Sequence, residues 1–283
     1  MNAYLELTKP RVTWLILMSA GLGYVFGLRG APDWWVLLHA VSGTGLLAAG
    51  TFTLNQWYER AADARMRRTW QRPLPSGRIR PAQAFRFGVA LSIAGFVQLA
   101  WGANLLAALL GLFTLLSYLL AYTPLKQRSK HSTTVGAVPG AMPPLIGYAA
   151  AGGTLTAEAW ILFAILFLWQ FPHFYAIAWM YREDYARAGI RMLPVVEPGG
   201  ESTARQIVLA SVLLIPVSLL PGLMSMSGRL YLFGALLLGA AFLYSGLRVA
   251  RERTVARARG VLLASVAYLP LLYGLMLADR IRL

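Results

Sequence analysis

The sequence contains no cysteine and few charged residues. Without Cys among its 283 residues, it can form neither a disulfide nor a thiolate metal site. Charged residues make up 13% of the chain and hydrophobic residues 58%. A soluble domain has roughly twice that charged fraction, so the composition indicates a polytopic membrane protein. No cleavable signal peptide is expected, because Met1–Arg11 is short and polar and no small-residue cleavage site follows the first apolar run.

Acidic residues are scarce. There are 11 Asp and Glu against 26 Lys and Arg, which gives a net charge of +15. A nucleic-acid-binding protein is one explanation of such a charge. However, membrane proteins also gather Lys and Arg in their cytoplasmic loops, and this second explanation fits the apolar composition. No nucleic-acid partner is therefore expected.

Nine apolar segments are each about long enough to cross a bilayer, which predicts an all-α bundle of nine transmembrane helices. The fifth is the weakest because Pro139, Pro143 and Pro144 interrupt it. Such breaks are tolerated where the backbone faces protein rather than lipid. The nine segments are Val12–Leu28, Val36–Tyr58, Phe85–Trp101, Leu105–Tyr122, Val135–Ala151, Trp160–Tyr181, Ile207–Met224, Leu230–Leu247 and Val261–Leu277.

The distribution of basic residues predicts the orientation. With the N-terminus inside, 22 of the 26 Lys and Arg residues fall in inner segments, and only Arg29, Arg229, Arg280 and Arg282 fall outside. This split follows the positive-inside rule. It places the N-terminus and both acidic motifs described below in the cytoplasm, and the C-terminus outside.

The two longest connections, near 59–84 and 182–206, are expected to be cytoplasmic catalytic loops of one domain that spans residues 1–283. They resemble each other. Trp57-Tyr58-Glu59-Arg60 precedes Arg72-Pro73-Leu74-Pro75, and Tyr181-Arg182-Glu183-Asp184 precedes Arg191-Met192-Leu193-Pro194. The similarity favours two related halves around one cavity, but chance explains so short a similarity equally well.

Three polar residues at the cytoplasmic end of the second apolar segment form the first candidate site. Asn55, Glu59 and Asp63 are spaced by four residues and therefore share one side of a helix. Their oxygens suit Mg²⁺, which usually binds a few carboxylates together with substrate phosphates. The alternative is a solvated helix end where both carboxylates pair with nearby arginines. Asn55 argues against that, because it lies deeper, between Leu54 and Trp57.

A run of arginines follows directly. Arg67, Arg68 and Arg72 are suited to clamp the oxygens of a diphosphate opposite the metal. Alternatively, their charge only holds this loop inside, a role that needs no fixed spacing. With the three oxygen donors beside them, these residues predict a metal–diphosphate site at a membrane surface.

Four stretches together resemble a known family. The segment from Asn55 to Pro75 resembles the first motif of the protohaem IX farnesyltransferases (haem O synthases), members of the UbiA-like superfamily of intramembrane prenyltransferases. The similarity covers nearly the whole chain. The other stretches are Leu7-Thr8-Lys9-Pro10-Arg11, Tyr122-Thr123-Pro124-Leu125-Lys126, and Trp169-Gln170-Phe171-Pro172-His173-Phe174 continuing to Tyr181-Arg182-Glu183-Asp184-Tyr185 and Met192-Leu193-Pro194.

The resemblance implies a central cavity and Mg²⁺-dependent transfer of farnesyl from farnesyl diphosphate to the vinyl group of haem b. The products would be haem O, for terminal oxidase biogenesis, and diphosphate. Haem b would be a substrate and Mg²⁺ the cofactor. The resemblance also implies a bacterial or archaeal cytoplasmic (inner) membrane, with haem A synthase or oxidase assembly factors as possible protein partners.

The second motif departs from the superfamily's pattern. Many members have two aspartates spaced by four residues, whereas here Ala188 follows Asp184 at that spacing and Arg187 follows Glu183. The adjacent Glu183 and Asp184 are therefore the expected second-motif metal ligands. Arg182 beside them is an expected diphosphate ligand.

His173 distinguishes between substrates. It lies in the middle of the sixth apolar segment, between Pro172 and Phe174. A lone intramembrane His is often only hydrogen-bonded between helices. Imidazole is also a common haem ligand, and a benzoate acceptor gives no reason for it. We therefore expect His173 to bind haem, while His39 and His131 are expected to be structural or solvated.

Tyr122 and Lys126 resemble the superfamily's Tyr-x-x-x-Lys element and are expected to hold diphosphate from a facing helix. The alternative for Lys126 is snorkelling at a helix end. In the implied reaction, Asn55, Glu59, Asp63, Arg68, Arg72, Tyr122 and Lys126 form the catalytic set.

Two other functions compete with this one. One is a related enzyme that acts on a quinone or chlorophyll precursor, against which His173 argues. The other is a transporter, which the interrupted fifth segment and the similar halves would fit. Two acidic, Arg-rich motifs on one side do not fit transport, since transport sites usually lie near the bilayer midplane.

Overall fold

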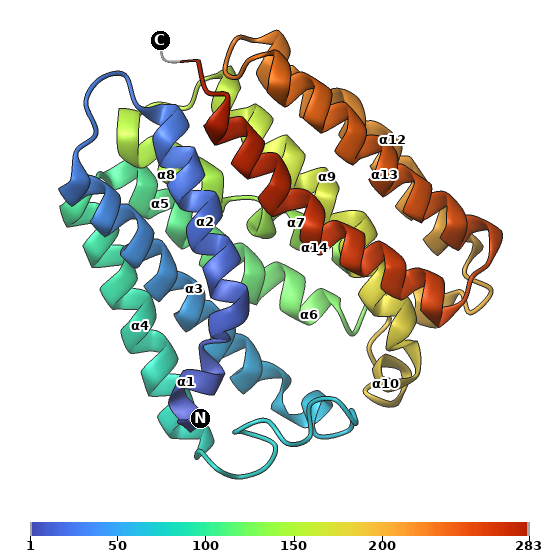
Figure 1. Ribbon diagram of the computed structural model, residues 1–283. Helices are drawn as coiled ribbons and strands as arrows, with labels where there is room; N and C mark the ends of the chain where they lie inside the picture. The colour runs from blue at the N-terminus through green and yellow to red at the C-terminus, as the bar shows by residue number, and fades with distance from the viewer. Residues whose placement is uncertain (1, 282–283) are drawn as a thin grey trace.

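The computed structural model describes residues 2–281, and these form a bundle of helices without a strand among them (Figure 1). Seven of the helices are long and apolar enough to cross a membrane. This confirms the all-α polytopic class and makes the chain a multi-pass membrane protein. The seven are α3 (Trp34–Asp63), α4 (Pro81–Gly102), the run α5–η1–α6 (Leu105–Leu125), α9 (Ala157–Met180), α12 (Glu201–Leu223), α13 (Arg229–Arg251) and α14 (Val255–Ala278).

The two remaining expected spans are shorter elements, so the predicted number of nine is approximate. The first is α2 (Pro10–Gly27), and the fifth is a broken pair, α7 (Ser132–Gly140) and α8 (Pro143–Gly152). The break falls at Ala141 and Met142, where the three prolines of this segment predicted it. Every residue from 141 to 150 is buried, so the interrupted backbone faces protein and not lipid.

Two glycines allow α2 and α8 to pack backbone against backbone. A Cβ atom at Gly147 would lie 1.8 Å from the Ala20 carbonyl oxygen, and one at Gly23 would lie 2.0 Å from the Pro144 carbonyl oxygen. No other residue fits such a contact, which is the way membrane helices commonly approach each other. The broken fifth span is thus fixed in the centre of the bundle.

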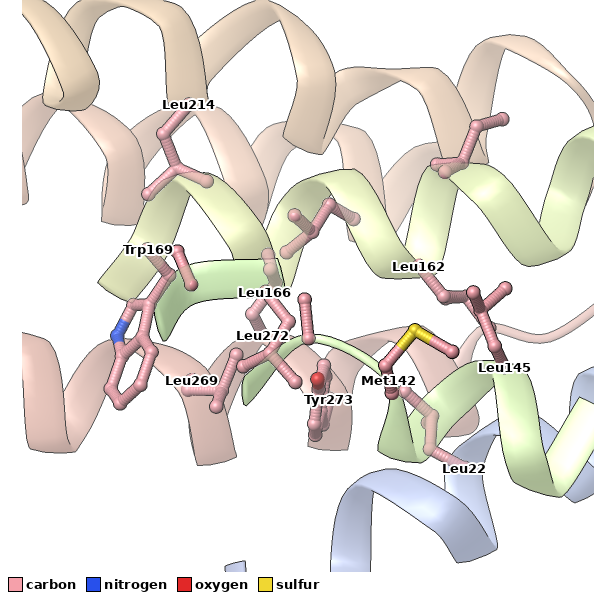
Figure 2. Packing of buried hydrophobic residues seen from close by; sticks show 14 of the residues in the cluster. Leu22, Met142, Leu145, Leu162, Leu166, Trp169, Leu214, Leu269, Leu272 and Tyr273 are labelled. Atoms are coloured by element: carbon pink, nitrogen blue, oxygen red, sulfur yellow. The ribbon is translucent and has the colours of Figure 1, made fainter. Parts of the chain in front are cut away.

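The apolar core lies around α9. Figure 2 shows side chains of α9, α8, α14 and α2 interleaving there. The outer faces are apolar as well, because many large hydrophobic side chains are exposed on α4, α5, α12, α13 and α14. Apolar side chains on both faces are expected of helices in a bilayer, where lipid is the solvent. The labelled core residues are Leu22, Met142, Leu145, Leu162, Leu166, Trp169, Leu214, Leu269, Leu272 and Tyr273.

The polar segments gather at one end of the bundle. Figure 1 places α1 (Ala3–Leu7), the loop after α3 and the short helix α10 (Arg182–Arg187) at the same end. Helix α11 (Leu193–Val196) then leads towards α12. Helix α3 has 30 residues and is about 45 Å long, more than the thickness of the hydrocarbon core, so its last turns reach these polar segments.

A groove of about 680 Å³ lies between α2, α3 and α14, lined among others by Met18, Trp34, Leu38, Pro270 and Tyr273. It is nearly all apolar and is located towards the start of α3. The acidic residues of the first motif lie at the opposite end of that helix. This groove is therefore separate from the candidate site.

Candidate active site

The three oxygen donors of α3 are buried. Asn55 is 1% exposed, Glu59 7% and Asp63 1%. Carboxylates removed from water at the end of a membrane helix need partners, because an unpaired buried charge is costly. A solvated helix end, the alternative considered for these residues, is not what the structure has.

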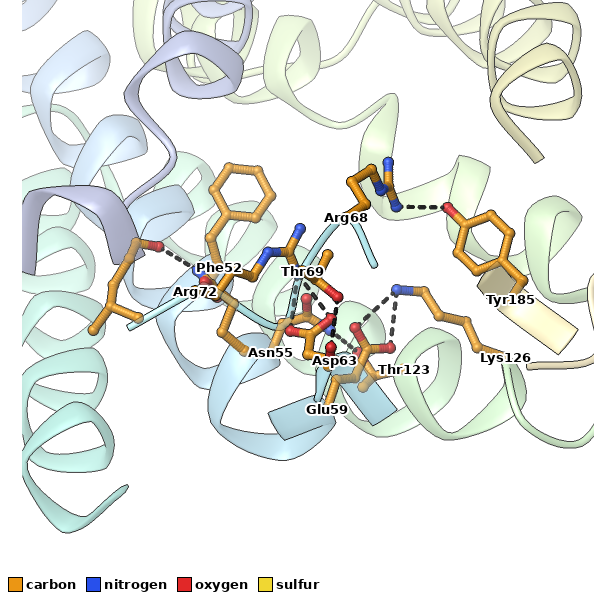
Figure 3. Close-up of polar contacts among 12 residues, drawn as sticks. Phe52, Asn55, Glu59, Asp63, Arg68, Thr69, Arg72, Thr123, Lys126 and Tyr185 are labelled. Atoms are coloured by element: carbon orange, nitrogen blue, oxygen red, sulfur yellow. Dashed lines mark hydrogen bonds and ion pairs between the residues drawn. The ribbon is translucent and has the colours of Figure 1, made fainter. Parts of the chain in front are cut away.

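Each of the three side chains has a specific partner (Figure 3). The Arg72 Nη1 atom lies 3.0 and 2.9 Å from the two carboxylate oxygens of Asp63. The Lys126 Nζ atom lies 3.0 and 3.2 Å from those of Glu59. Each acid of the first motif is thus paired with a residue predicted to bind diphosphate. Asp63 is paired with Arg72 of the following loop, and Glu59 with Lys126 of a facing helix.

Asn55 donates its amide hydrogen to the Thr123 hydroxyl, over 3.1 Å. That hydroxyl donates its own hydrogen to the Tyr118 carbonyl oxygen, so it acts as the acceptor towards Asn55. Thr123 follows a turn of π-helix, η1 (Ser117–Tyr122). Such turns occur frequently at functional sites. The side-chain oxygen of Asn55 makes no hydrogen bond to a described residue and is available to a ligand.

Lys126 remains protonated in this arrangement. Burial by itself lowers the pKa of Lys126, but the Glu59 carboxylate outweighs this effect and raises that pKa well above its usual value. The Lys126 ammonium also lies 4.6 Å from the centre of the Tyr122 ring. Lys126 is therefore fixed at the site and does not snorkel towards water.

A second lysine, which spacing did not single out, also lies at this site. Lys9 precedes α2 in a left-handed conformation, with φ of 48°, and its ammonium lies 4.9 Å from the Phe52 ring centre. Burial, with repulsion from Arg72 and Lys126, lowers the pKa of Lys9 to about 7, although Glu59 and Asp63 act in the opposite direction.

The second motif meets the first through Asp184, which is 7% exposed. Its two carboxylate oxygens accept hydrogen bonds from the backbone N–H groups of Arg67 and Arg68, over 3.2 and 3.3 Å. Asp184 also pairs with Arg187. The adjacent Glu183 is exposed. Of the two expected second-motif ligands, only Asp184 therefore lies at the site, and its oxygens bind the first loop.

The arginines of the two motifs occupy different surroundings. The Arg68 Nη2 atom donates to the Tyr185 hydroxyl over 3.1 Å, and its guanidinium lies 4.6 Å from the Tyr181 ring centre. Arg67 contributes its backbone N–H, while the residue itself is exposed. Arg182 stacks on Trp179, with 4.5 Å between guanidinium and ring centre. Arg68 thus joins the two loops, whereas Arg182 lies against the end of the preceding helix, α9.

A small cluster of buried apolar residues packs the two loops against the ends of α3 and α9. It contains residues from the end of α3, the end of α9 and both loops, which explains why the two polar stretches lie together. The second loop also reaches the facing helix, because the Arg191 N–H donates to the Lys126 carbonyl oxygen over 2.7 Å. The members of the cluster are Ala62, Met66, Ala178, Ala188, Ile190 and Met192.

The donor set fits Mg²⁺ bound together with a diphosphate, and does not form a closed metal cage. The amide oxygen of Asn55 and the carboxylates of Glu59 and Asp63 are hard oxygen donors. Within residues 2–281, no group of three or more His, Cys, Asp or Glu side chains is placed to hold a metal by itself. Mg²⁺ typically uses one or two carboxylates, with water and phosphate oxygens filling the other positions.

His173 lies on α9, away from these loops. Its Nδ1 atom is 2.8 Å from the Ser265 hydroxyl of α14. Its ring stacks on that of Trp169, with centres 4.7 Å apart. His39 is buried near the start of α3 beside Trp35 and Trp101. His131 is exposed between α6 and α7.

The sequence also matches a known protein family. The model of the UbiA prenyltransferase family matches residues 16–271, which is most of the chain. The chain belongs to the UbiA prenyltransferase family. A relative from Solibacter usitatus, named protoheme IX farnesyltransferase, is 67% identical over 289 aligned positions and covers 99% of both chains.

Solved structures share the UbiA fold. One is a digeranylgeranylglyceryl phosphate synthase, with a TM-score of 0.81 at 20% identity over 98% of this chain and 97% of that one. Another is a UbiA homologue from Archaeoglobus fulgidus bound to GPP and Mg²⁺, with a TM-score of 0.66 at 17% identity over 97% and 99%. At such identities the likeness shows the fold alone.

Three residues of this UbiA family member were not predicted as site residues. Lys9 belongs to the opening motif, and its position beside a proline was the available signal. Thr123 lies between Tyr122 and Lys126, the two residues of this stretch that were predicted to hold diphosphate. For Ser265, which binds His173 from a distant helix, the sequence offers no local signal.

Proposed function

We propose that this chain transfers a farnesyl group from farnesyl diphosphate to a vinyl group of haem b. The observation that carries the proposal is the buried pairing of Glu59 with Lys126 and of Asp63 with Arg72, beside Asp184 of the second motif. The name of the relative from Solibacter usitatus and the prenyltransferase family support the choice of reaction.

The reaction balances without an oxidant. The bond between farnesyl C1 and the diphosphate oxygen breaks, and the electron pair leaves with diphosphate. The vinyl group of haem b forms a carbon–carbon bond with C1, and the resulting cation takes hydroxide from water, which releases a proton. The product is haem O with its hydroxyethylfarnesyl group.

The basic residues of the site would bind the departing diphosphate. Arg68, Arg72 and Lys126 are the proposed ligands, with Lys9 as an additional cation close to them. In the free protein, two of these are paired with Asp63 and Glu59. When substrate binds, diphosphate oxygens would replace the two carboxylates as partners of Arg72 and Lys126. The positive charges would then lie beside the leaving diphosphate, where negative charge develops. Exposed Arg67 and stacked Arg182 would contribute less.

We further propose that Asn55, Glu59 and Asp63 hold Mg²⁺ when substrate is bound. The ion would supply a Lewis acid that neutralises charge on the leaving diphosphate. Asp184 would keep the first loop closed over this position through the Arg67 and Arg68 backbone. Tyr122 would line the site beside Lys126.

For the acceptor, we propose that His173 binds the haem iron. His173 lies seven residues before the end of α9, about 10 Å of helix into the bilayer. Its ring is only partly buried, and within the described chain its Nε2 atom has no hydrogen-bond partner. This nitrogen is therefore free to bind iron, for which imidazole is a common ligand.

The orientation is also a proposal. The loops near 59–84 and 182–206 would be the cytoplasmic catalytic loops of a single domain, in a bacterial or archaeal cytoplasmic membrane. The N-terminus would be cytoplasmic and the C-terminus outside. Basic residues at the end of the bundle that holds the site support this. Arg282, one of the outer basic residues, lies outside the described residues. Association with haem A synthase or oxidase assembly factors stays a prediction.

The test is a direct assay of the product. The purified protein is incubated with haem b, farnesyl diphosphate and Mg²⁺, and the porphyrin product is weighed by mass spectrometry. We expect a mass increase of one farnesyl group plus one hydroxyl group, with diphosphate released in equal amount. Farnesylation of 4-hydroxybenzoate in place of haem b would contradict the proposal.

A further inference from the structure

The hydrogen bonds around Ser265 determine which nitrogen of His173 carries its proton. The Ser265 hydroxyl donates to the Leu262 carbonyl oxygen over 2.6 Å. A hydroxyl has only one hydrogen, so towards His173 its oxygen acts as the acceptor. The Nδ1 atom of His173, 2.8 Å away, is therefore the donor. This leaves the lone pair of the neutral ring on Nε2.

Trp169 contacts both Ser265 and His173 and also holds the His173 ring in place. Its indole N–H donates to the Ser265 carbonyl oxygen over 2.9 Å. Its ring stacks on that of His173, with planes 23° apart. Trp169 and His173 are four residues apart on α9 and therefore neighbours on one face. The imidazole thus has a fixed rotamer as well as a fixed tautomer, and both depend on a fully buried residue of α14.

We propose that Ser265 is a positioning residue that holds His173 in the Nδ1–H form and aims its Nε2 atom at the haem iron. The inference rests on the proposed function, in which haem b is the acceptor. Metal-bound imidazoles commonly donate their second N–H to a fixed acceptor, and loss of that acceptor typically weakens metal binding by roughly 10- to 100-fold.

The chemistry of this acceptor suits a substrate and not a resident cofactor. A carboxylate acceptor strengthens the donor character of an imidazole more than a neutral hydroxyl does. Ser265 therefore orders the ligand while leaving the iron–nitrogen bond of moderate strength. An enzyme that must release its haem product after each cycle requires a ligand of this kind.

The experiment measures haem binding by Ser265→Ala, with Ser265→Thr retaining the hydroxyl and Ser211→Ala as a matched control. Ser211 is a buried serine whose hydroxyl, among residues 2–281, binds only the Ile207 carbonyl of its own helix. For each protein, haem b is titrated and the iron–histidine stretching frequency of the ferrous complex is recorded by resonance Raman spectroscopy. That frequency responds to the hydrogen bond on Nδ1 and not to general stability.

We expect Ser265→Ala to weaken haem binding roughly 10- to 100-fold and to lower the stretching frequency. Binding of farnesyl diphosphate with Mg²⁺ should stay unchanged. Ser265→Thr should restore both haem signals, and Ser211→Ala should match the wild type. Equal affinity and frequency in Ser265→Ala and the wild type would overturn the inference. An equal loss of farnesyl diphosphate binding would overturn it too, by showing a merely structural role.

A second variant separates this inference from the proposed function. If His173→Ala loses the histidine-bound haem spectrum while Ser265→Ala retains it, the positioning role of Ser265 is wrong and the haem contact stands. If His173→Ala retains that spectrum, His173 is not the ligand and the inference about Ser265 is wrong with it. Farnesyl transfer to haem is tested independently by the mass of the product.

Discussion

The unusual environment of Lys9 predicts that farnesyl diphosphate binding depends on pH. In the free protein the pKa of Lys9 is lowered from 10.5 to about 7, first by burial and then by Arg72 and Lys126. A bound diphosphate would supply negative charge beside this ammonium and raise its pKa again. Binding is then linked to the uptake of a proton by Lys9, so affinity is greatest below pH 7 and falls as pH rises above it.

The size of the effect follows from the pKa. Between pH 6 and pH 8, the protonated fraction of a group with a pKa near 7 falls from roughly nine-tenths to one-tenth. If binding restores the ordinary lysine pKa, the dissociation constant of farnesyl diphosphate rises about tenfold over this range. At pH 8, close to one proton should be taken up for each molecule bound.

The assay is isothermal titration calorimetry with Mg²⁺ and without haem, at pH 6, 7 and 8, in buffers that differ in ionisation enthalpy. Lys9→Arg keeps a cation that never deprotonates, so the tenfold change should disappear. Lys130→Arg is the matched control, since Lys130 pairs with Glu197 on the exposed surface. The ionisation of farnesyl diphosphate itself contributes equally to the titrations of the wild type, Lys9→Arg and Lys130→Arg, so it does not affect the comparison between them. A tenfold change that persists in Lys9→Arg would refute the reasoning.

Three further predictions concern the site and the bundle. Asn55→Ala, Asp63→Ala and Arg72→Ala should each reduce farnesyl transfer roughly 100-fold or more in protein that still inserts and folds, and near-normal turnover in all three would contradict the site. Chelation with EDTA should stop diphosphate release until Mg²⁺ is added back, whereas release that continues would exclude the metal role. Gly147→Val should lower the thermal unfolding temperature strongly, because its Cβ would overlap the Ala20 carbonyl, while Gly260→Ala, with open space around it, should not.

Much of the fold was predictable because a bilayer imposes one length and one chemistry on every crossing. The spans, the interruption at three prolines and the polar end of α3 all follow from that constraint. The π-helical turn of η1 was not predictable, because its residues are as apolar as those of an ordinary helix. That turn precedes Thr123, whose hydroxyl binds Asn55.

The sequence predicted which polar residues of α3 share one side of the helix, but not which partners they bind. Spacing placed Asn55, Glu59 and Asp63 on one side of a helix, and the structure has them buried together. The residue at which α10 begins determines whether Glu183 or Asp184 of the second motif is buried. The sequence around these two residues does not indicate where that helix begins. The helix starts at Arg182, which buries Asp184 with Ala188 one turn later and leaves Glu183 exposed.

The bonds of Asp184 also limit how far the two similar loops are equivalent. Glu59 of the first motif binds a side chain of a facing helix, whereas Asp184 of the second motif binds peptide nitrogens. Peptide nitrogens are present whatever side chains the first loop carries. Substitution of Arg67 during evolution would therefore leave the hydrogen bonds from the loop backbone to Asp184 in place. Exchanging the two acidic stretches would remove these hydrogen bonds.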